Sequence, residues 1–460
     1  MTPNPQAYRP ETAILQLGDA FYDPVAAADF PETRLRFRND RAAASVGLDG
    51  LSDADWVAHF GRFQPLDGSL SEPLALRYHG HQFRVYNPDI GDGRGFLFAQ
   101  LRDDRGRLMD LGTKGSGQTP WSRFGDGRLT LKGGVREVLA TEMLEALGVE
   151  TSRTFSLIET GEELERGDEP SPTRSAVLVR LSHGHIRIGT FQRLAYHRDE
   201  DGIRRLTAYV LQQYYGDPGD GEAGEDAAVR LLGHVVRRAA RLAASYMAAG
   251  FVHGVLNSDN INVTGESFDY GPWRFAPTWD PGFTAAYFDH AGLYAFGRQP
   301  EAIHWDVMQL AVSLRLVSEA EPLIAVLEGF GEQYQPAVSE AILWRLGLNP
   351  RDPESDRALV QAVERVLRGE AASIDRFFFD GFGGVLPDSY GPAYDDLRAV
   401  LAAYQPRAGR DHPYWRGEPC SMLIDEVEAI WSAIDRDDDW SPFEAKVAAI
   451  RAMGDALAGA

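Results

Sequence analysis

Oxygen-bearing side chains in one short stretch could hold a divalent cation. Asn260 closes the segment His253-Gly-Val-Leu-Asn-Ser-Asp-Asn260, and Asp269 follows in Asp269-Tyr-Gly271. Amide and carboxylate oxygens suit Mg²⁺ or Mn²⁺ that bridges the phosphates of a nucleotide. Asp259, beside Asn260, is a further carboxylate that could accept a proton. The alternative is a turn rich in Asn and Asp over 257–260, and these residues alone do not decide between the two.

The spacing matches the catalytic and metal-binding loops of kinase-like phosphotransferases, with one residue replaced. Those enzymes place an Asp shortly after the His, then an Asn, and later an Asp-Phe-Gly. His253 and Asn260 keep this register, but Val255 stands where the catalytic Asp would be. A valine cannot accept a proton from a substrate hydroxyl. We therefore expect the nucleotide and metal equipment without the usual base, and Asp259 as a possible substitute.

A lysine and a glutamate further upstream could form a second part of such a site. Lys114 ends the segment 110–114, which has the character of a strand end, and Glu137 lies in a predicted helix. Kinases hold a strand lysine against the nucleotide phosphates by pairing it with a helix glutamate. The alternative is a surface lysine and a first-turn glutamate favoured by the helix dipole.

Glycine-rich and arginine-rich segments could contact phosphates. Gly91-Asp-Gly-Arg94 would let the backbone approach an oxyanion, although Gly-Asp-Gly is also a common turn. The loop 115–127 is long and rich in glycine and hydroxyls, which is typical of binding loops. Arg180 and Arg187 could clamp a polyphosphate. A metal site at the two histidines between them is not favoured, since no third ligand is apparent.

Composition limits the class of protein. The 460 residues are 44% hydrophobic, enough for a large core, and carry a formal net charge of -22, which disfavours nucleic acid as a partner. No apolar run is long enough to cross a membrane, and the N-terminus does not resemble a secretory signal. Cys420 is the single cysteine, which excludes an intramolecular disulfide and fits a cytoplasmic location.

The order of the predicted elements indicates an α+β fold with two lobes. Apolar runs predict strands at 95–101, 108–111, 154–158 and 176–180, and helical spacing predicts helices at 135–147 and 227–249. The segment 261–263 is interpreted as part of a strand pair that carries the two metal ligands. We divide the chain into an N-terminal extension packed on the body (1–75), a strand-rich lobe (76–205), a helical lobe with the catalytic and metal loops (206–400) and a C-terminal helical segment (401–460).

Many motifs in one order resemble the selenoprotein O family, from about Leu17 to near Leu316. These motifs are His79-Gly-His-Gln-Phe83, Asn87-Pro, Gly91-Asp-Gly-Arg94, Lys114-Gly, Thr119-Pro, Ser122-Arg, Gly125-Asp-Gly127, Arg136-Glu137, His253-Gly, Asn257-Ser-Asp-Asn260 and Asp269-Tyr-Gly-Pro272. The resemblance implies a protein-kinase-like fold that binds ATP in a flipped orientation. It also implies transfer of AMP to Ser, Thr or Tyr hydroxyls of proteins, with Mg²⁺ or Mn²⁺.

The resemblance assigns roles position by position. Lys114 and Glu137 would form the phosphate-positioning ion pair, Asp259 would accept the proton, and Asn260 and Asp269 would hold the metal. Nucleotide contacts are implied for Gly91, Gly93, Arg94, Asp126, Gly127, Arg180 and Arg187. The chain departs from the family pattern at its end, where no selenocysteine or cysteine stands near Ala460, so we expect no redox control by a terminal disulfide.

Other activities stay open beside protein adenylylation. UTP could replace ATP, and a conventional kinase could use Asp259 as a displaced base. A nucleotide-binding scaffold is the third alternative, although the retention of Lys114, Glu137, Asn260 and Asp269 argues against it. The protein substrates, the choice between Mg²⁺ and Mn²⁺ and the oligomeric state do not follow from the sequence.

Overall fold

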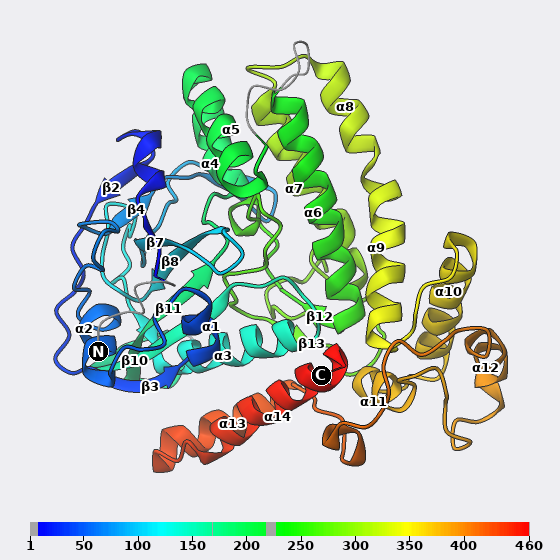
Figure 1. Cartoon of the computed structure of the whole chain (residues 1–460). Helices are drawn as coiled ribbons and strands as arrows, with labels where there is room; N and C mark the ends of the chain where they lie inside the picture. Colours follow the sequence, from blue (N-terminus) through cyan, green and yellow to red (C-terminus); the bar gives the residue numbers. More distant parts are fainter. Residues whose placement is uncertain (1–7, 168, 218–226, 460) are drawn as a thin grey trace.

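Strands dominate the first part of the chain and helices the second, as expected for the α+β class. The computed structural model describes residues 8–167, 169–217 and 227–459. Figure 1 shows the sheet on one side, a layer of long helices on the other, and a helical C-terminal region beside them. The predicted α+β fold class is confirmed.

An antiparallel sheet forms the strand-rich part. Within the described residues, its strand order is β2-β4-β7-β8-β11-β10-β3, and β1 and β9 pair with β7 and β11. The strands are β1 Pro10–Glu11, β2 Tyr22–Pro24, β3 Arg34–Arg38, β4 Leu74–Leu76, β7 Leu97–Arg102, β8 Leu108–Lys114, β9 Leu129–Thr130, β10 Arg153–Leu164 and β11 Thr173–Ser182. Two short pairs lie apart from it, namely β5 Gly80–Gln82 with β6 Val85–Asn87, and β12 Phe251–Val252 with β13 Arg274–Phe275.

The N-terminal segment contributes strands to this sheet. β1 and β2 extend it at one end, and β3 pairs with β10 at the other. Its helices α1 Asp40–Ser45 and α2 Asp53–Phe60 cover one face, where Trp56 stacks on Phe155 at 4.8 Å between ring centroids. The division of the chain into four segments stays a prediction.

The helix α3, Leu131–Ala146, lies across the other face of the sheet and carries Glu137. Thr130 caps its first turn by accepting the Gly133 N–H, and Gly148, with φ +79°, follows its end. The predicted helix at 135–147 is thus confirmed, with its start one turn earlier. Figure 1 shows the C-terminal helix α14, Ser441–Ala458, close to α3, and Arg451 of α14 contacts Glu142 of α3 at 2.7 Å.

The remaining helices form the helical lobe and the C-terminal region. They are α4 Ile188–Tyr196, α5 Glu200–Tyr215, α6 Ala227–Ala249, α7 Gln299–Leu314, α8 Ala320–Glu328, α9 Phe330–Arg345, α10 Pro353–Gly369, α11 Ile374–Asp380, α12 Asp395–Leu401 and α13 Ile424–Asp437. Short 3₁₀ turns occur at Ala13–Leu17, Ser258–Asn260, Phe296–Arg298, Pro392–Tyr394 and Pro413–Arg416. The prediction for α6 is confirmed at both ends. No helix in the described ranges is both long and apolar enough to span a bilayer.

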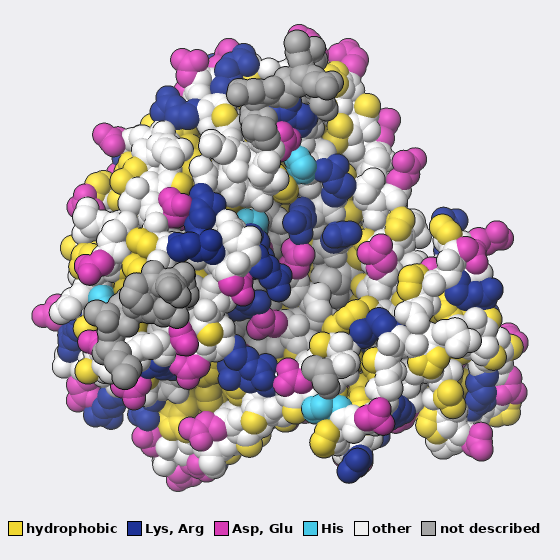
Figure 2. All heavy atoms as spheres, viewed as in Figure 1, with side chains coloured by type: hydrophobic (Ala, Val, Ile, Leu, Met, Phe, Trp, Pro, Cys, Tyr) yellow, Lys and Arg dark blue, Asp and Glu magenta, His cyan; other side chains and the backbone are white. Residues whose placement is uncertain are grey.

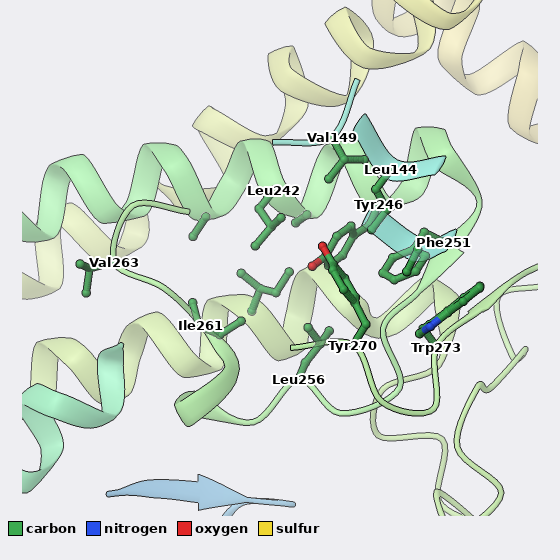
Figure 3. Packing of buried hydrophobic residues seen from close by; sticks show 14 of the residues in the cluster. Leu144, Val149, Leu242, Tyr246, Phe251, Leu256, Ile261, Val263, Tyr270 and Trp273 are labelled. Atoms are coloured by element: carbon green, nitrogen blue, oxygen red, sulfur yellow. The ribbon is translucent and has the colours of Figure 1, made fainter. Parts of the chain in front are cut away.

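The loop that carries Asp269 packs beneath α6. Figure 3 shows Tyr246 of α6 against Tyr270 of the loop, with Leu242, Phe251 and Ile261 around them. The Tyr246 and Tyr270 hydroxyls both bond to the buried Ser267 hydroxyl, at 2.5 and 2.7 Å. Hydrogen bonds inside an apolar core fix a backbone more strictly than packing alone, because a displaced hydroxyl would lose its partner.

The predicted strand pair at 261–263 is wrong. The described residues form only an isolated bridge there, between Asn262 and Arg187. Asn262 turns the chain instead, since its side chain donates to the Gly184 carbonyl at 2.6 Å and accepts the Thr264 N–H at 3.1 Å. An Asn side chain that bonds to nearby backbone competes with an extended ladder.

Glu266, in the same loop, is buried. No cationic side chain among the described residues forms a salt bridge with it. One carboxylate oxygen accepts the His183 N–H at 2.7 Å. Burial raises the pKa of Glu266 from 4.5 to about 7, because the charged form loses its hydration. From about pH 4.5 to 7 the unfolded chain therefore releases a proton that the folded chain retains. Folding stability falls across this window as the pH rises.

We predict that Glu266→Gln is more stable than the parent protein at pH 8, by up to about 3 kcal/mol, and equally stable near pH 4. Glutamine keeps the acceptor for His183 and removes the ionisation. Urea denaturation at several pH values measures the difference, with the more exposed Glu364→Gln as the control. Equal stability of the Glu266→Gln and parent proteins at pH 8 would contradict the prediction.

Candidate functional site

A cavity of about 690 Å³ opens between the sheet, the loops 90–95 and 121–128, and the segment after α6 that carries Asp259 and Asp269. Its charged lining residues are the cations Arg94, Lys114, Arg123, Arg128, Arg166, Arg180 and Arg187 and the acids Asp92, Asp126, Glu165, Asp259 and Asp269. Cations outnumber acids here, although acids exceed cations by 22 over the whole chain. A local excess of positive charge in an acidic protein selects for an anionic ligand.

Lys114 and Glu137 form a buried ion pair in the wall of this cavity. Lys114 ends β8 and Glu137 lies on α3, so the sheet and the helix packed on it bring the two together. The lysine Nζ also lies 3.0 Å from Oδ1 of Asp269. Both members of the pair are almost fully buried, which makes the loss of either partner costly. Strand, helix and loop thus bring together the lysine and the glutamate, and the alternative of a surface lysine does not apply.

Asp269 is held among three cations. Besides Lys114, Arg180 lies 3.5 Å from Oδ1 and Arg187 lies 3.4 Å from Oδ2. Burial alone would raise the pKa of Asp269, but these positive charges outweigh it and hold the pKa well below its usual range. The residue has a φ of +66°, an uncommon backbone conformation that the packed loop beneath α6 maintains. Asp269 is therefore a fixed, ionised carboxylate.

The two arginines are placed by aromatic rings as well as by charge. The Arg187 guanidinium lies 4.4 Å from the Tyr78 ring and 4.7 Å from the Phe268 ring. Arg180 lies 5.2 Å from the Phe268 ring and donates to Nε2 of His185 at 3.2 Å. Because that His185 nitrogen accepts a hydrogen bond, His185 serves as a neutral support for Arg180.

Asp259 lies at the edge of the same cavity, in the 3₁₀ turn Ser258–Asn260. Burial raises its pKa to about 6, since the nearby charge of Arg187 offsets only part of the lost hydration. Its Oδ1 has no hydrogen-bond partner among the described residues. A carboxylate with a raised pKa in the lining of a cavity can accept a proton from a bound hydroxyl.

Val255 contributes its backbone where a kinase would use a side chain. The Asn260 side-chain amide donates to the Val255 carbonyl at 2.9 Å, which leaves the Asn260 amide oxygen available. That oxygen and the ionised Asp269 carboxylate are hard donors of the kind that Mg²⁺ and Mn²⁺ take. No cluster of three or more His, Cys, Asp or Glu suited to a metal occurs within the described ranges. Asn260 and Asp269 would supply two protein ligands, and phosphate oxygens of a nucleotide would supply others.

The glycine-rich segment Gly91-Asp-Gly-Arg94 packs against the loop 115–127. A Cβ added at Gly91 would lie 2.6 Å from Cγ of Trp121, and one at Gly93 would lie 2.9 Å from the Trp121 carbonyl oxygen. Trp121 in turn donates its indole N–H to Asp23 of β2 at 2.9 Å. The N-terminal segment thereby fixes the loop that walls the cavity.

The structure brings most of the predicted site residues to this cavity. Gly91, Gly93, Arg94, Lys114, Asp126, Gly127, Arg180, Arg187, Asp259 and Asp269 line it. Glu137 stands behind Lys114, and Asn260 follows Asp259 without lining the cavity. Asp126 is paired with Arg166 at 2.8 Å, so a nucleotide contact at this position would involve that pair.

Sequence reasoning missed several lining residues, among them Asp92, Arg123, Arg128 and Arg166. Asp92 lies 3.4 Å from Arg187 and sits within the glycine-rich segment, which was a usable signal. Arg166 comes from the hairpin between β10 and β11, and no local pattern distinguishes it from a surface arginine.

Comparison with known proteins gives the family. The sequence model described as "Protein adenylyltransferase SelO" matches residues 6–382, most of the chain. The chain belongs to the SelO family. A SelO-family relative named "Protein nucleotidyltransferase YdiU" from Synechocystis sp. is 44% identical, over 94% of this chain and 96% of the relative. A protein of the same name from Gloeobacter violaceus is 45% identical, over 94% of this chain and 93% of the relative.

Among solved structures, the kinase domain of a Toxoplasma gondii rhoptry antigen gives a TM-score of 0.29 at 12% identity, covering 64% of this chain and 84% of that one. This score is too low to carry an argument. Membership of the SelO family agrees with the resemblance seen in the motifs, so the family assignment is confirmed. The roles of individual residues are proposals.

We predict that Gly91→Ala weakens ATP binding about 10-fold, equivalent to about 1.4 kcal/mol, because the new methyl group displaces Trp121 and the loop behind it. Isothermal titration calorimetry measures the change. Gly331→Ala on α9 is the matched control, since nothing lies within 4 Å of its added Cβ. Unchanged ATP affinity in Gly91→Ala would show that the packing of these two loops does not matter to the site.

Proposed function

We propose that this enzyme transfers AMP from ATP to Ser, Thr or Tyr hydroxyls of proteins and releases diphosphate. The observation that carries the proposal is the cationic cavity in which Lys114, Arg180 and Arg187 converge on Asp269 beside the buried Asp259. Family membership supports the nucleotidyl transfer, since the family is described as a protein adenylyltransferase.

The chemistry requires a base, a fixed phosphate chain and a stabilised leaving group. In the proposed step Asp259 accepts the proton of the substrate hydroxyl, whose oxygen attacks the α-phosphorus. The bond from the α-phosphorus to the oxygen of the β-phosphate breaks, and diphosphate leaves with the bonding electrons. A phosphodiester then joins AMP to the protein. A divalent cation on Asn260 and Asp269 would supply charge neutralisation at the phosphates.

The number of arginines favours transfer of AMP over transfer of the terminal phosphate. The diphosphate released by AMP transfer carries more negative charge than the nucleoside diphosphate released by a kinase. Preformed donors stabilise such charge best. Arg94, Arg123, Arg128 and Arg166 lie around the cavity beyond the central cations. We therefore place the β- and γ-phosphates toward these arginines and the α-phosphate toward Asp259, the flipped orientation.

Labelled nucleotides test the proposal directly. We expect self-modification, in the presence of Mg²⁺ or Mn²⁺, with ATP labelled at the α-phosphate and none with ATP labelled at the γ-phosphate. Label from the γ-position would establish a kinase that uses Asp259 as a displaced base. α-Labelled UTP in a parallel reaction measures the choice of nucleotide. Absence of label from every nucleotide, with added protein substrates as well, would favour a binding scaffold.

Two isosteric variants are predicted to separate proton transfer from nucleotide binding. Asp259→Asn removes the proton acceptor and should lower transfer by about 10²- to 10⁴-fold while ATP still binds. Asp269→Asn should abolish metal-dependent ATP binding as well as transfer, because the amide cannot neutralise a cation. Transfer rates and calorimetric ATP affinities give the two readouts. Parent-like transfer by folded Asp259→Asn would exclude Asp259 as the base.

A further inference from the structure

A second cationic groove runs along α6, and none of its residues lines the ATP cavity. The helix carries Arg230, His234, Arg237, Arg238 and Arg241, whose spacing of three and four residues puts them on one face. Figure 2 shows Lys and Arg side chains gathered with a histidine where Figure 1 places α6. In a chain with a net charge of -22, such a cluster needs a physical reason.

The groove consists of two adjoining cavities of different character. The first, of about 380 Å³, is lined by Tyr215, His234, Arg237, Arg238, Arg241 and Gln333. The second, of about 420 Å³, shares Arg238 and Arg241 with the first, includes their carboxylate neighbours Glu150 and Glu340, and continues over Leu147, Leu242 and Trp344. Together they offer a polar, cationic end and an apolar end, of the combined size that small-molecule sites have.

Two of the arginines lack effective neutralisation. Among the described residues, no carboxylate lies within salt-bridge distance of Arg237. The Arg237 side chain donates a hydrogen bond to Nδ1 of His234 at 2.8 Å. Arg241 is 64% exposed and lies 4.0 Å from an equally exposed Glu340. A pair of this kind contributes little free energy, so both guanidinium groups are available to a ligand.

His234 fixes the geometry of the polar end. Its Nε2 donates to Asp217 at 3.3 Å while Nδ1 accepts from Arg237, so the imidazole is neutral. The ring stacks on Tyr215 with centroids 4.3 Å apart. Arg237 is thereby held over the groove, and less side-chain entropy is lost when it binds an anion.

We propose that this groove binds a small phosphate-bearing molecule with an apolar body. The phosphate would lie among Arg237, Arg238 and Arg241, whose planar guanidinium groups match phosphate oxygens in a bidentate manner. The apolar body would cover Leu147, Leu242 and Trp344 in the second cavity.

The groove is joined to the loop that carries Asp269. Arg238 lies 3.0 Å from both carboxylate oxygens of Glu150, and the Glu150 carbonyl accepts the Ser267 N–H at 2.8 Å. Gly265 of the same loop lines the second cavity. A phosphate that draws Arg238 away from Glu150 therefore acts on the segment just before Asp269. Any effect on AMP transfer rests on the proposed function, whereas binding itself does not.

Phenyl phosphate is a probe with both required parts, and saturation-transfer NMR of its ring protons detects binding to the full chain. We expect the signal to fall at least 5-fold in Arg237→Glu and in Arg241→Glu. It should persist in Arg204→Glu, an equally exposed arginine on α5 whose nearest carboxylate is Glu200 at 3.9 Å. Probe bound in the ATP cavity would give the same signal in all three variants, and circular dichroism checks that each is folded.

Competition separates the two ends of the groove. Inorganic phosphate and benzyl alcohol each fill only one end of the groove, so each should displace phenyl phosphate only at higher concentration. Equal signals from Arg241→Glu and Arg204→Glu would overturn the proposal. Displacement by benzyl alcohol at concentrations as low as those of phenyl phosphate itself would also overturn it, because the arginines would then not contribute to binding. These results do not depend on whether AMP transfer occurs.

Discussion

The electrostatic environment of Asp269 is the constraint on which the rest of the structure depends. Lys114 at the end of β8, Arg180 on β11 and Arg187 just before α4 all lie close to one carboxylate. Without that negative charge, three buried cations would repel one another in a medium that screens them poorly. The strand, the helix and the loop must therefore pack in the one arrangement that keeps these cations around Asp269.

The same constraint explains the uneven polarity of the interior. Aromatic rings of Tyr78 and Phe268 lie against the arginines, and Tyr246 and Tyr270 fix the loop from the other side through Ser267. The cost of burying these groups is met by hydrogen bonds and ring contacts that also restrict their motion. A rigid set of donors is what a reaction at phosphorus needs, since the charges do not have to be rearranged during the step.

Most of the residues that the sequence singled out line one cavity, whereas the packing of the loops around that cavity could not be predicted. The kinase-like order of several motifs, rather than the spacing of any one pair, favoured Lys114 with Glu137 and Asn260 with Asp269. Lys114 ends an apolar strand and Glu137 lies in a helix with a clear apolar face, so both elements could be recognised locally. Apolar periodicity also placed both ends of α6. The strand assigned to 261–263 failed because Asn262 uses its side chain to turn the backbone, a competition that hydrophobicity does not report. The contacts of Trp121 with Asp23, and of Arg166 with Asp126, depend on tertiary proximity and have no local signature.

The packing of α14 beside α3 has a consequence for how the enzyme is made. Gly454 lies so close to Ala146 that an added Cβ would be 3.2 Å from its backbone, and Arg451 neutralises Glu142 on the helix that also bears Glu137. Residues 309 positions apart in the chain thus meet at α3. A nascent polypeptide emerging from the ribosome leaves that side of α3 uncovered until α14 has been synthesised. Synthesis of α14 and the complete packing of the helix that bears Glu137 are thereby coupled, although the two helices lie far apart in the chain.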